Sequence, residues 1–261
     1  MPQGMSVIWK PSHCPRCGHP IRARDNVPVL GWLMLQGKCR DCGEPISPRY
    51  AIVEAVMGAT FFVLAYVELF SGGANLPGGP LSNLTGALNV VLYPQWGMII
   101  VYACHCLLFC VLMCVVLCNR DKKSVPTTLM ILGFLAAFLL VPYYSRLDLT
   151  IPFSNHPAGA FIYCALGGII GAILGSLASR LDCQSKNDCG KYFSLNLLSG
   201  STLAGLLLGW QVVFAMCVVL LVAAVSRLRN KGMCSPLVVD AIFCATFFQL
   251  LVWEKLNQAI L

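Results

Sequence analysis

The chain has 261 residues, of which 57% are hydrophobic and 11% are charged, and its formal net charge is +7. A soluble domain carries about 25% charged residues, so this composition excludes an ordinary soluble protein and predicts a polytopic membrane protein. In such a protein an excess of Lys and Arg reports topology, so the net charge gives no reason to expect a nucleic-acid partner.

Two Cys-x-x-Cys turns lie near the start of the chain. Each turn directs two thiolates to one point, and two turns together supply the four tetrahedral ligands of a structural Zn²⁺ site. Two redox dithiols or two disulfides are the alternatives, and the Lys and Arg residues that crowd the segment argue for a reducing compartment and against disulfides. We expect a small zinc-ribbon-like domain over residues 1–50, with the ligands Cys14, Cys17, Cys39 and Cys42.

The remaining residues, 51–261, alternate between apolar segments and short polar or glycine-rich loops. We expect an all-α membrane domain of about seven transmembrane helices. The predicted spans are residues 51–70, 98–118, 125–144, 159–180, 192–208, 211–225 and 236–253.

Positive charge alternates along these loops without an exception. Of the 18 Lys and Arg residues, 16 fall on one side of the predicted topology, in residues 1–50, 119–124, 180–191 and 227–231. The positive-inside rule therefore predicts a cytoplasmic N-terminal domain and a C-terminus on the outer side.

Three polar residues in the predicted spans need an explanation. We expect Glu54, one turn into the first span, to be a boundary residue favoured by the helix dipole. His105 in the second span is expected to be buried in the bundle and not to bind a metal. Asp240 in the last span is a candidate functional residue because intramembrane carboxylates are rare. The alternative is that Asp240 lies close enough to the interface to reach water or the Arg227–Lys231 cluster.

The residues around the cysteines resemble a known family. The matching stretches are Pro11–Arg22 (PSHCPRCGHPIR), Asp25–Leu33 (DNVPVLGWL) and Pro45–Tyr50 (PISPRY) followed by Val53–Ala55. They are similar to the N-terminal domain of bacterial type IV prepilin peptidases, and Leu208–Gln211 and Ser235–Pro236 resemble later parts of that family more weakly.

The resemblance implies a multi-pass protein of the bacterial inner membrane with its N-terminal domain in the cytoplasm. Members of the family are aspartic endopeptidases that cleave the leader peptides of prepilins and pseudopilins, for type IV pili or type II secretion. Many members also methylate the new N-terminus with S-adenosylmethionine, a cofactor that is expected here from the resemblance alone. The implied partners are the lipid bilayer and prepilin or pseudopilin leader peptides.

The catalytic positions depart from the family pattern. In the family two Asp carboxylates at cytoplasmic helix ends share a proton and activate a water. The first lies seven residues before a proline, and counting back from Pro126 gives Asn119. Counting back from Leu208–Trp210 puts Leu197 at the second position, with Asn196 adjacent. An amide does not take a proton from water near neutral pH, so the dyad is not intact.

Two main hypotheses follow from this conflict. In the first the protein is a working peptidase with a rearranged dyad, Asp121 and Asp188, which both lie on the predicted cytoplasmic face. In the second it is a pseudoenzyme that binds prepilins or secretion components without cutting them. The residues favour the second, because Asp121 is balanced by adjacent Arg and Lys residues and Asp188 lies too early for the helix it should open. A channel or transporter is a third reading, weakened by the shortage of intramembrane charges.

Overall fold

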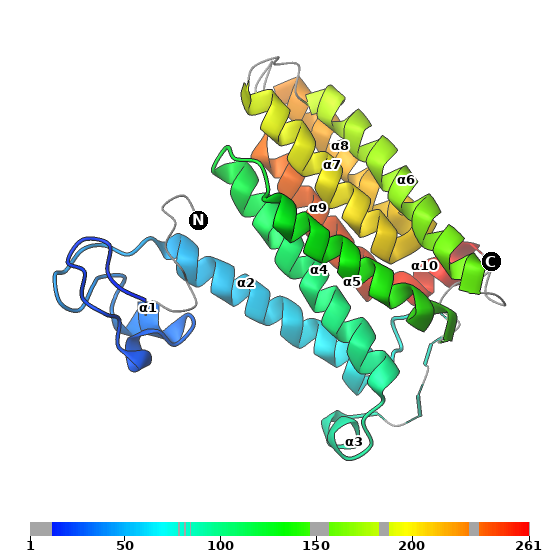
Figure 1. The fold of residues 1–261 in the computed structure, drawn as a ribbon, viewed down its shortest axis with the longest axis horizontal. Coiled ribbons are helices and arrows are strands. Elements are labelled where there is room, and N and C mark those ends of the chain that lie inside the picture. Colours follow the sequence, from blue (N-terminus) through cyan, green and yellow to red (C-terminus); the bar gives the residue numbers. More distant parts are fainter. Residues whose placement is uncertain are drawn as a thin grey trace. The chain divides into compact units, whose positions relative to one another are not determined.

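The computed structural model describes residues 12–77, 79–80, 82–83, 85–146, 157–182, 188–229 and 235–260. It divides into two compact units, Met1–Thr60 and Phe61–Leu261. Helix α2 (Pro48–Leu64) begins in the first unit and ends in the second (Figure 1). The predicted domain boundary at residue 50 therefore falls near the start of this helix.

The first unit is built mainly from turns, with the short helices η1 (Ala23–Asp25) and α1 (Leu30–Met34) before α2. In its described residues no regular strand forms, and two isolated antiparallel bridges join His13 to Pro20 and Lys38 to Pro45. Each bridge closes the base of one Cys-x-x-Cys turn. The two turns are therefore copies of one local structure.

The backbone hydrogen bonds of the two turns match pair by pair. In the first turn the N–H of Cys14 donates to His19 O at 3.0 Å, and in the second the N–H of Cys39 donates to Glu44 O at 2.8 Å. Each turn ends on a glycine with positive φ, +71° at Gly18 and +69° at Gly43. The residue at this position must adopt the left-handed backbone conformation so that the chain returns across the turn. Glycine adopts this conformation without steric cost.

The second unit is helical throughout its regular elements. The π-helical turn η2 (Ala65–Phe70) continues α2, and the short α3 (Ala87–Leu92) follows. The long helices are α4 (Trp96–Arg120), α5 (Thr127–Arg146), α6 (Pro157–Asp182), α7 (Asp188–Leu208), α8 (Val212–Arg229) and α9 (Pro236–Leu251). The turn η3 (Gly209–Gln211) links α7 to α8, and α10 (Trp253–Ile260) ends the described chain.

All seven predicted spans fall on these helices. Four stretches of the described chain are long and apolar enough to cross a membrane, namely Pro48–Phe70, Trp96–Arg120, Phe161–Asp182 and Gly190–Leu228. The last contains both α7 and α8, and Thr127–Leu139 and Pro236–Leu251 are shorter apolar helices. The predicted class, an all-α polytopic membrane protein with a small N-terminal cysteine-rich domain, is confirmed.

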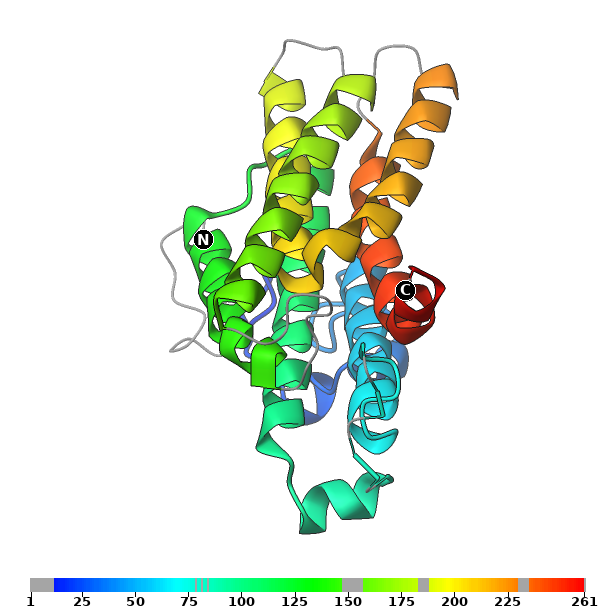
Figure 2. The same ribbon diagram turned by 90° about the vertical axis from the view of Figure 1, so that its right-hand side faces the viewer.

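The long helices of the second unit run alongside one another (Figure 2). Helix α7 packs against α6, α4 and α5, and α9 packs against α8 and α4. Successive helices run in opposite directions, so the end of α4 lies at the same end of the unit as the starts of α5 and α7. We call this the α4–α7 end. The positively charged segment 119–124 belongs to it, together with the end of α6 at Arg180 and the start of α7 near Lys191.

Helices α6 and α7 make the most intimate contact in the unit, and glycines line it. A Cβ built on Gly205 would overlap the carbonyl oxygen of Gly167, and a Cβ on Gly167 would overlap that of Gly205. Small residues allow membrane helices to approach until their backbones touch. The glycines of α6 therefore lie at its interface with α7.

Candidate functional site

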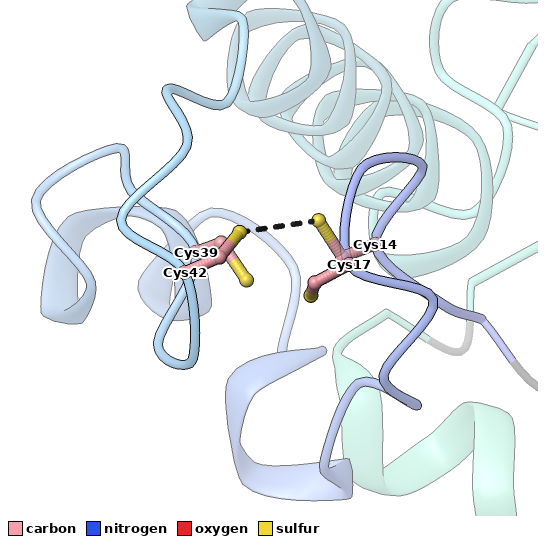
Figure 3. Close-up of side chains that lie close together, drawn as sticks. All are labelled: Cys14, Cys17, Cys39 and Cys42. Carbon is pink, nitrogen blue, oxygen red and sulfur yellow. Dashed lines mark hydrogen bonds between the residues drawn. The ribbon is translucent and has the colours of Figure 1, made fainter.

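Four cysteines in the first unit form a group that could hold a metal ion (Figure 3). Their sulfur atoms all lie within 4.8 Å of one another, with Cys14 and Cys17 on one turn facing Cys39 and Cys42 on the other. The Cys14 and Cys42 sulfurs are 3.8 Å apart. A tetrahedral Zn²⁺ site with Zn–S bonds of about 2.3 Å has S–S edges of about 3.8 Å. The geometry fits a four-thiolate metal site, and the described cysteines form no disulfide.

The electrostatics of the group also favour a cation. Backbone N–H groups of Cys17 and Arg16 donate to the Cys14 sulfur and lower its pKa to about 6. The N–H of Glu44 likewise favours the thiolate of Cys42, but desolvation and the neighbouring thiols outweigh it and raise the pKa of Cys42 to about 12. Because the four sulfur atoms are so close together, repulsion between thiolates prevents all four thiols from losing their protons when no cation is bound. A bound dication would offset this repulsion and stabilise the four thiolates.

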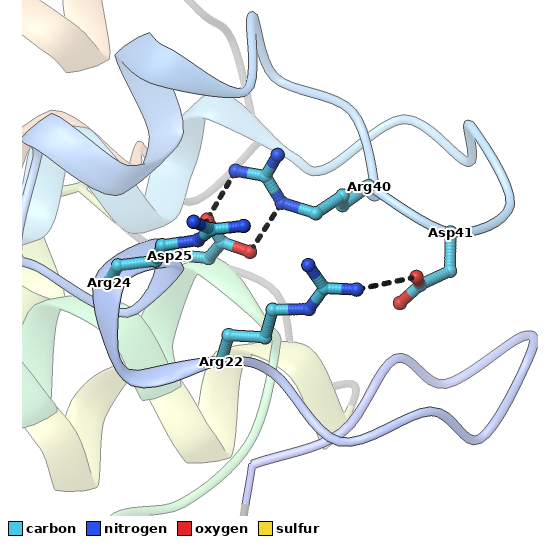
Figure 4. Close-up of polar contacts among 5 residues, drawn as sticks. All are labelled: Arg22, Arg24, Asp25, Arg40 and Asp41. Atoms are coloured by element: carbon cyan, nitrogen blue, oxygen red, sulfur yellow. Dashed lines mark hydrogen bonds and ion pairs between the residues drawn. The ribbon is translucent and has the colours of Figure 1, made fainter.

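Ion pairs connect the two turns around the cysteines (Figure 4). Arg40 beside the second turn donates two hydrogen bonds to Asp25, Nη2 to Oδ1 at 2.6 Å and Nε to Oδ2 at 2.7 Å. Arg22 lies 3.8 Å from Asp41, and Arg16 pairs with Glu44. The Asp25 side chain is only 5% exposed, so this bidentate pair is the most protected of the three. Such contacts orient the ligand-bearing turns.

The Arg40–Asp25 pair is expected to affect the pH at which the first unit releases its metal. Hydrogen bonds from Arg40 hold the pKa of Asp25 below its ordinary value, so the pair stabilises the fold above the unfolded-state value of about 3.9 and this stabilisation is lost as pH falls. We expect Asp25→Asn to release zinc at a higher pH than the wild type in a titration followed with a zinc indicator. The control Asp41→Asn removes a longer, more exposed pair and should shift the release much less. Equal release curves for Asp25→Asn and wild type would contradict the prediction.

Glu54 has a role that the sequence did not indicate. Its Oε2 accepts a hydrogen bond from the N–H of Val29 at 2.8 Å. Val29 has φ +62° and ψ −53°, and the N–H of Leu30 donates to Pro28 O at 2.6 Å. This is the strained form of γ-turn, which costs on the order of 1–3 kcal/mol for a β-branched residue. Glu54 therefore holds the strained loop before α1 against the start of α2.

At the α4–α7 end, helix α4 closes in a Schellman motif. The N–H of Lys123 donates to Cys118 O at 2.9 Å, and the N–H of Lys122, at φ +55°, donates to Asn119 O at 3.0 Å. This hydrogen-bond pattern satisfies the last carbonyls of the helix. Asn119 is thus part of the helix cap, and the exposed Asp121 is the C-cap residue.

Asn196 binds the loop between α4 and α5 through both atoms of its amide. Its Oδ1 accepts from the N–H of Val125 at 3.0 Å, and its Nδ2 donates to Lys123 O at 2.8 Å. The Asn196 side chain is 1% exposed, and the neighbouring Leu197 is fully buried in the helix bundle. We call this contact the Asn196 clamp. In the sequence Asn196 stands out only as the neighbour of Leu197, although a buried amide in an apolar helix by itself indicates a hydrogen-bond partner.

The other carboxylates at this end have different surroundings. Asp188 begins α7, so the expectation that it lies too early to open this helix is wrong, while its side chain lies outside the described residues. Asp240 in α9 accepts two hydrogen bonds from Arg120 at the end of α4, at 2.5 Å and 3.4 Å. Asp240 therefore has Arg120 as a partner, and part of the Arg227–Lys231 cluster lies outside the described residues. The candidate pair Asp121 and Asp188 stays a prediction.

The Asn196 clamp predicts which substitutions the α4–α7 end tolerates. Asn196→Leu removes two hydrogen bonds to partly buried backbone groups, the N–H of Val125 and the C=O of Lys123, so we expect a loss of about 1–3 kcal/mol of unfolding free energy. Asn196→Asp keeps the acceptor but places a carboxylate against Lys123 O, and it should be at least as destabilising at neutral pH and less so in acid. Unfolding in mixed micelles measures both variants. Ser194→Ala, on the same helix, is the control, and a Leu variant as stable as this control would contradict the role.

The arrangement defines a class of protein: a polytopic helical membrane protein with an N-terminal unit whose four cysteines could hold a metal ion. Residues 1–68 match the family model for the Bacterial Peptidase A24 N-terminal domain. The chain therefore carries this domain and is related to the prepilin leader peptidases, which confirms the resemblance seen in the sequence.

Individual relatives agree with this relationship. The prepilin leader peptidase/N-methyltransferase of Klebsiella pneumoniae is 46% identical over 77 residues, covering 30% of this chain and 33% of the relative. The type 4 prepilin-like proteins leader peptide-processing enzyme of Escherichia coli O78:H11 is 51% identical over 70 residues, 27% of this chain and 26% of the relative. A prepilin leader peptidase/N-methyltransferase of Aeromonas hydrophila is 28% identical over 227 residues, 82% of this chain and 58% of the relative.

These matches cover less than two thirds of each relative, and the strong ones are confined to about a third of it or less. No solved structure matches the chain.

Proposed function

We propose that this chain is a prepilin-peptidase-like membrane protein that binds the leader segments of prepilins or pseudopilins without cutting them. The supporting observation is the Asn196 clamp. The region where the family pattern expects a carboxylate holds an amide whose donor and acceptor are both used on backbone groups. A side chain committed in this way has no free group with which to activate a water.

The rearranged dyad of Asp121 and Asp188 is the competing proposal. In its favour, both residues lie at helix ends at the α4–α7 end, and α4 packs against α7. Against it, Asp188 lies eight residues before Asn196, which is about 12 Å along the helix axis at 1.5 Å per residue. The loop that carries Asp121 is held at Asn196, two turns away from Asp188. This separation favours the non-cleaving function.

The setting proposed for this function follows from charge and chemistry. We infer from the positive segments that the α4–α7 end and the cysteine unit lie on the cytoplasmic side of a bacterial inner membrane and that the C-terminus lies outside. In the reducing cytoplasm the four cysteines stay reduced and free to bind a metal, and Zn²⁺ is the proposed metal. Accessibility of an introduced single cysteine to a membrane-impermeant reagent tests each side separately.

The function is tested with a prepilin that has a basic leader, incubated with the purified protein in lipid. We expect the prepilin to co-purify with the protein and to keep its leader, as measured by mass spectrometry of the pilin N-terminus. An active prepilin leader peptidase is the positive control for the substrate. Leader removal by the wild type would overturn the non-cleaving proposal, and failure to co-purify would overturn leader binding.

If leader removal occurs, two variants identify its source. Loss of cleavage in Asp121→Asn and in Asp188→Asn, with both proteins still folded, would establish the rearranged dyad. The matched control is Asp240→Asn, which changes a carboxylate in the same unit that is already paired with Arg120. Cleavage unaffected by Asp121→Asn or Asp188→Asn would exclude that dyad.

Methyl transfer is a second candidate activity, because the first unit contains a cavity of about 570 Å³ lined by Trp32, Tyr50, Asp25 and Glu54 among others. Cavities of this size, with an aromatic lining and a few polar groups, accommodate small cofactors. Isothermal titration of the zinc-loaded protein with S-adenosylmethionine tests this candidate. Saturable binding that is weakened by Tyr50→Ala would support it, and absence of binding would remove it.

A further inference from the structure

Helix α1 presents apolar side chains to the outside of the small first unit. Leu30, Leu33 and Met34 are 57%, 55% and 69% exposed, and their spacing places them on one face of the helix. The opposite face points into the unit, because Gly31 is buried and Trp32 lines the cavity. We call the three exposed side chains the α1 apolar face. Neighbouring exposed apolar side chains mark a surface that a partner covers.

The α1 apolar face lies beside the place where the chain enters its first membrane span. That span is Pro48–Phe70, and Glu54 lies six residues after its start, which is about 9 Å along the helix axis at 1.5 Å per residue. The N–H of Val29, the residue before α1, donates to Glu54 Oε2 at 2.8 Å. The start of α1 is therefore level with the first two turns of the span.

A second set of contacts ties the rest of α1 to the same part of the chain. The Nε1 of Trp32 donates to Ile46 O at 2.9 Å, and Ile46 lies two residues before Pro48. The N–H of Ile46 in turn donates to the carbonyl oxygen of Gly37, beyond the end of α1, at 2.7 Å. These contacts all lie within the first unit. Both ends of α1 are therefore attached to residues that adjoin the membrane.

We propose that the α1 apolar face is a membrane anchor, which inserts into the boundary between headgroups and acyl chains in the leaflet where Pro48–Phe70 begins. The partner is the lipid surface itself. Amphipathic segments bury their apolar face about 5–10 Å into this boundary, and the contact between Val29 and Glu54 holds α1 at the level of the span. This inference uses only the first unit and its span, so it does not depend on leader binding.

The charge of the first unit suits the same partner. Residues 12–60 contain six Lys and Arg residues and four Asp and Glu residues, and basic groups beside a span are attracted to anionic headgroups. The anchor gives the unit a second attachment to the membrane in addition to α2. Rotation of the unit about the axis of α2 would pull the α1 apolar face out of the lipid, so the anchor fixes the orientation of the four cysteines relative to the membrane.

The first experiment uses the unaltered full-length protein in lipid nanodiscs that contain a lipid with a photoreactive group on its acyl chain. Peptide mass spectrometry after illumination locates the lipid adducts. We expect adducts on residues 28–35 as well as on the span Pro48–Phe70, and none on residues 38–45, which carry the second Cys-x-x-Cys turn and serve as the internal control. Adducts on the span without adducts on residues 28–35 would overturn the proposal.

The second experiment measures depth with a fluorescent amino acid placed at Met34, the most exposed member of the α1 apolar face. The matched control carries the same label at Arg16, whose side chain is 71% exposed on the first Cys-x-x-Cys turn, and the zinc content of both proteins is measured. In bilayers of lipids brominated on the acyl chain, we expect the label at Met34 to lose most of its emission and the label at Arg16 to lose little. Equal quenching at the two positions would mean that water or protein covers the face, and would overturn the anchor.

Discussion

Replacing Cys14 with serine is expected to empty the metal site and unfold the first unit. Cys14 is the buried member of the four, and its thiolate is the one most favoured by backbone donors. Structural Zn²⁺ contributes about 10–16 kcal/mol of apparent binding energy in small metal-dependent domains. The first unit has few buried apolar residues of its own, so loss of the metal removes most of what holds its turns together.

The measurement is zinc per chain by elemental analysis, combined with limited proteolysis of residues 12–47. We expect about one zinc per chain in the wild type, as a single four-cysteine site requires, and a small fraction of that in Cys14→Ser. Cys217→Ser, which alters an exposed cysteine of the second unit, is the control and should retain the metal. A Cys14→Ser protein with full zinc content would reject the four-cysteine site.

Adding a side chain to Gly205 is expected to break the contact between α6 and α7. In Gly205→Val the new side chain would overlap the Gly167 carbonyl group. Because this group belongs to the backbone of a helix, it cannot move aside as a flexible side chain could. Overpacking of this kind costs about 3 kcal/mol, and occasionally more. Unfolding in lipid or detergent should show a large loss of stability, and much of the protein should fail to assemble.

Gly200 provides a matched control on the same helix. A Cβ there would meet its nearest neighbour, Val115, at an ordinary distance of 3.5 Å. Gly200→Ala should therefore change the unfolding midpoint little, while Gly205→Ala already lowers it. If Gly205→Ala and Gly200→Ala are equally stable, the close backbone contact is not present in the folded protein.

The cysteine site and the helices were predictable because their signals are local. Cys14 and Cys17 are two residues of one turn, and the spacing alone dictates that their thiolates converge. The spans are apolar over their whole length, so their positions follow from composition whatever their neighbours are. The boundaries differ by a few residues because polar caps extend the helices beyond the apolar run, as α4 shows by continuing to Arg120.

The polar contacts between helices could not be read from the sequence. Glu68 lies inside an apolar span, and the sequence does not show its partner. His105 becomes that partner only because the fold places α4 against η2. The role of Asn196 depends on the approach of the loop that holds Lys123 and Val125. Glu54 was expected to interact with the helix dipole, but the strained turn at Val29 gives it a specific partner that only the fold reveals.

The contact between α6 and α7 also bears on how the protein is made. Glycine has no side-chain conformational entropy to lose when a contact forms. The contact between Gly167 and Gly205 therefore costs only backbone entropy. The two helices are also neighbours in the chain, so their association does not require any later segment. Helix α9, by contrast, packs against α4 across more than a hundred residues of intervening chain. During synthesis α6 and α7 can therefore pair as a hairpin in the membrane, while the contact between α4 and α9 must wait until α9 has emerged from the ribosome.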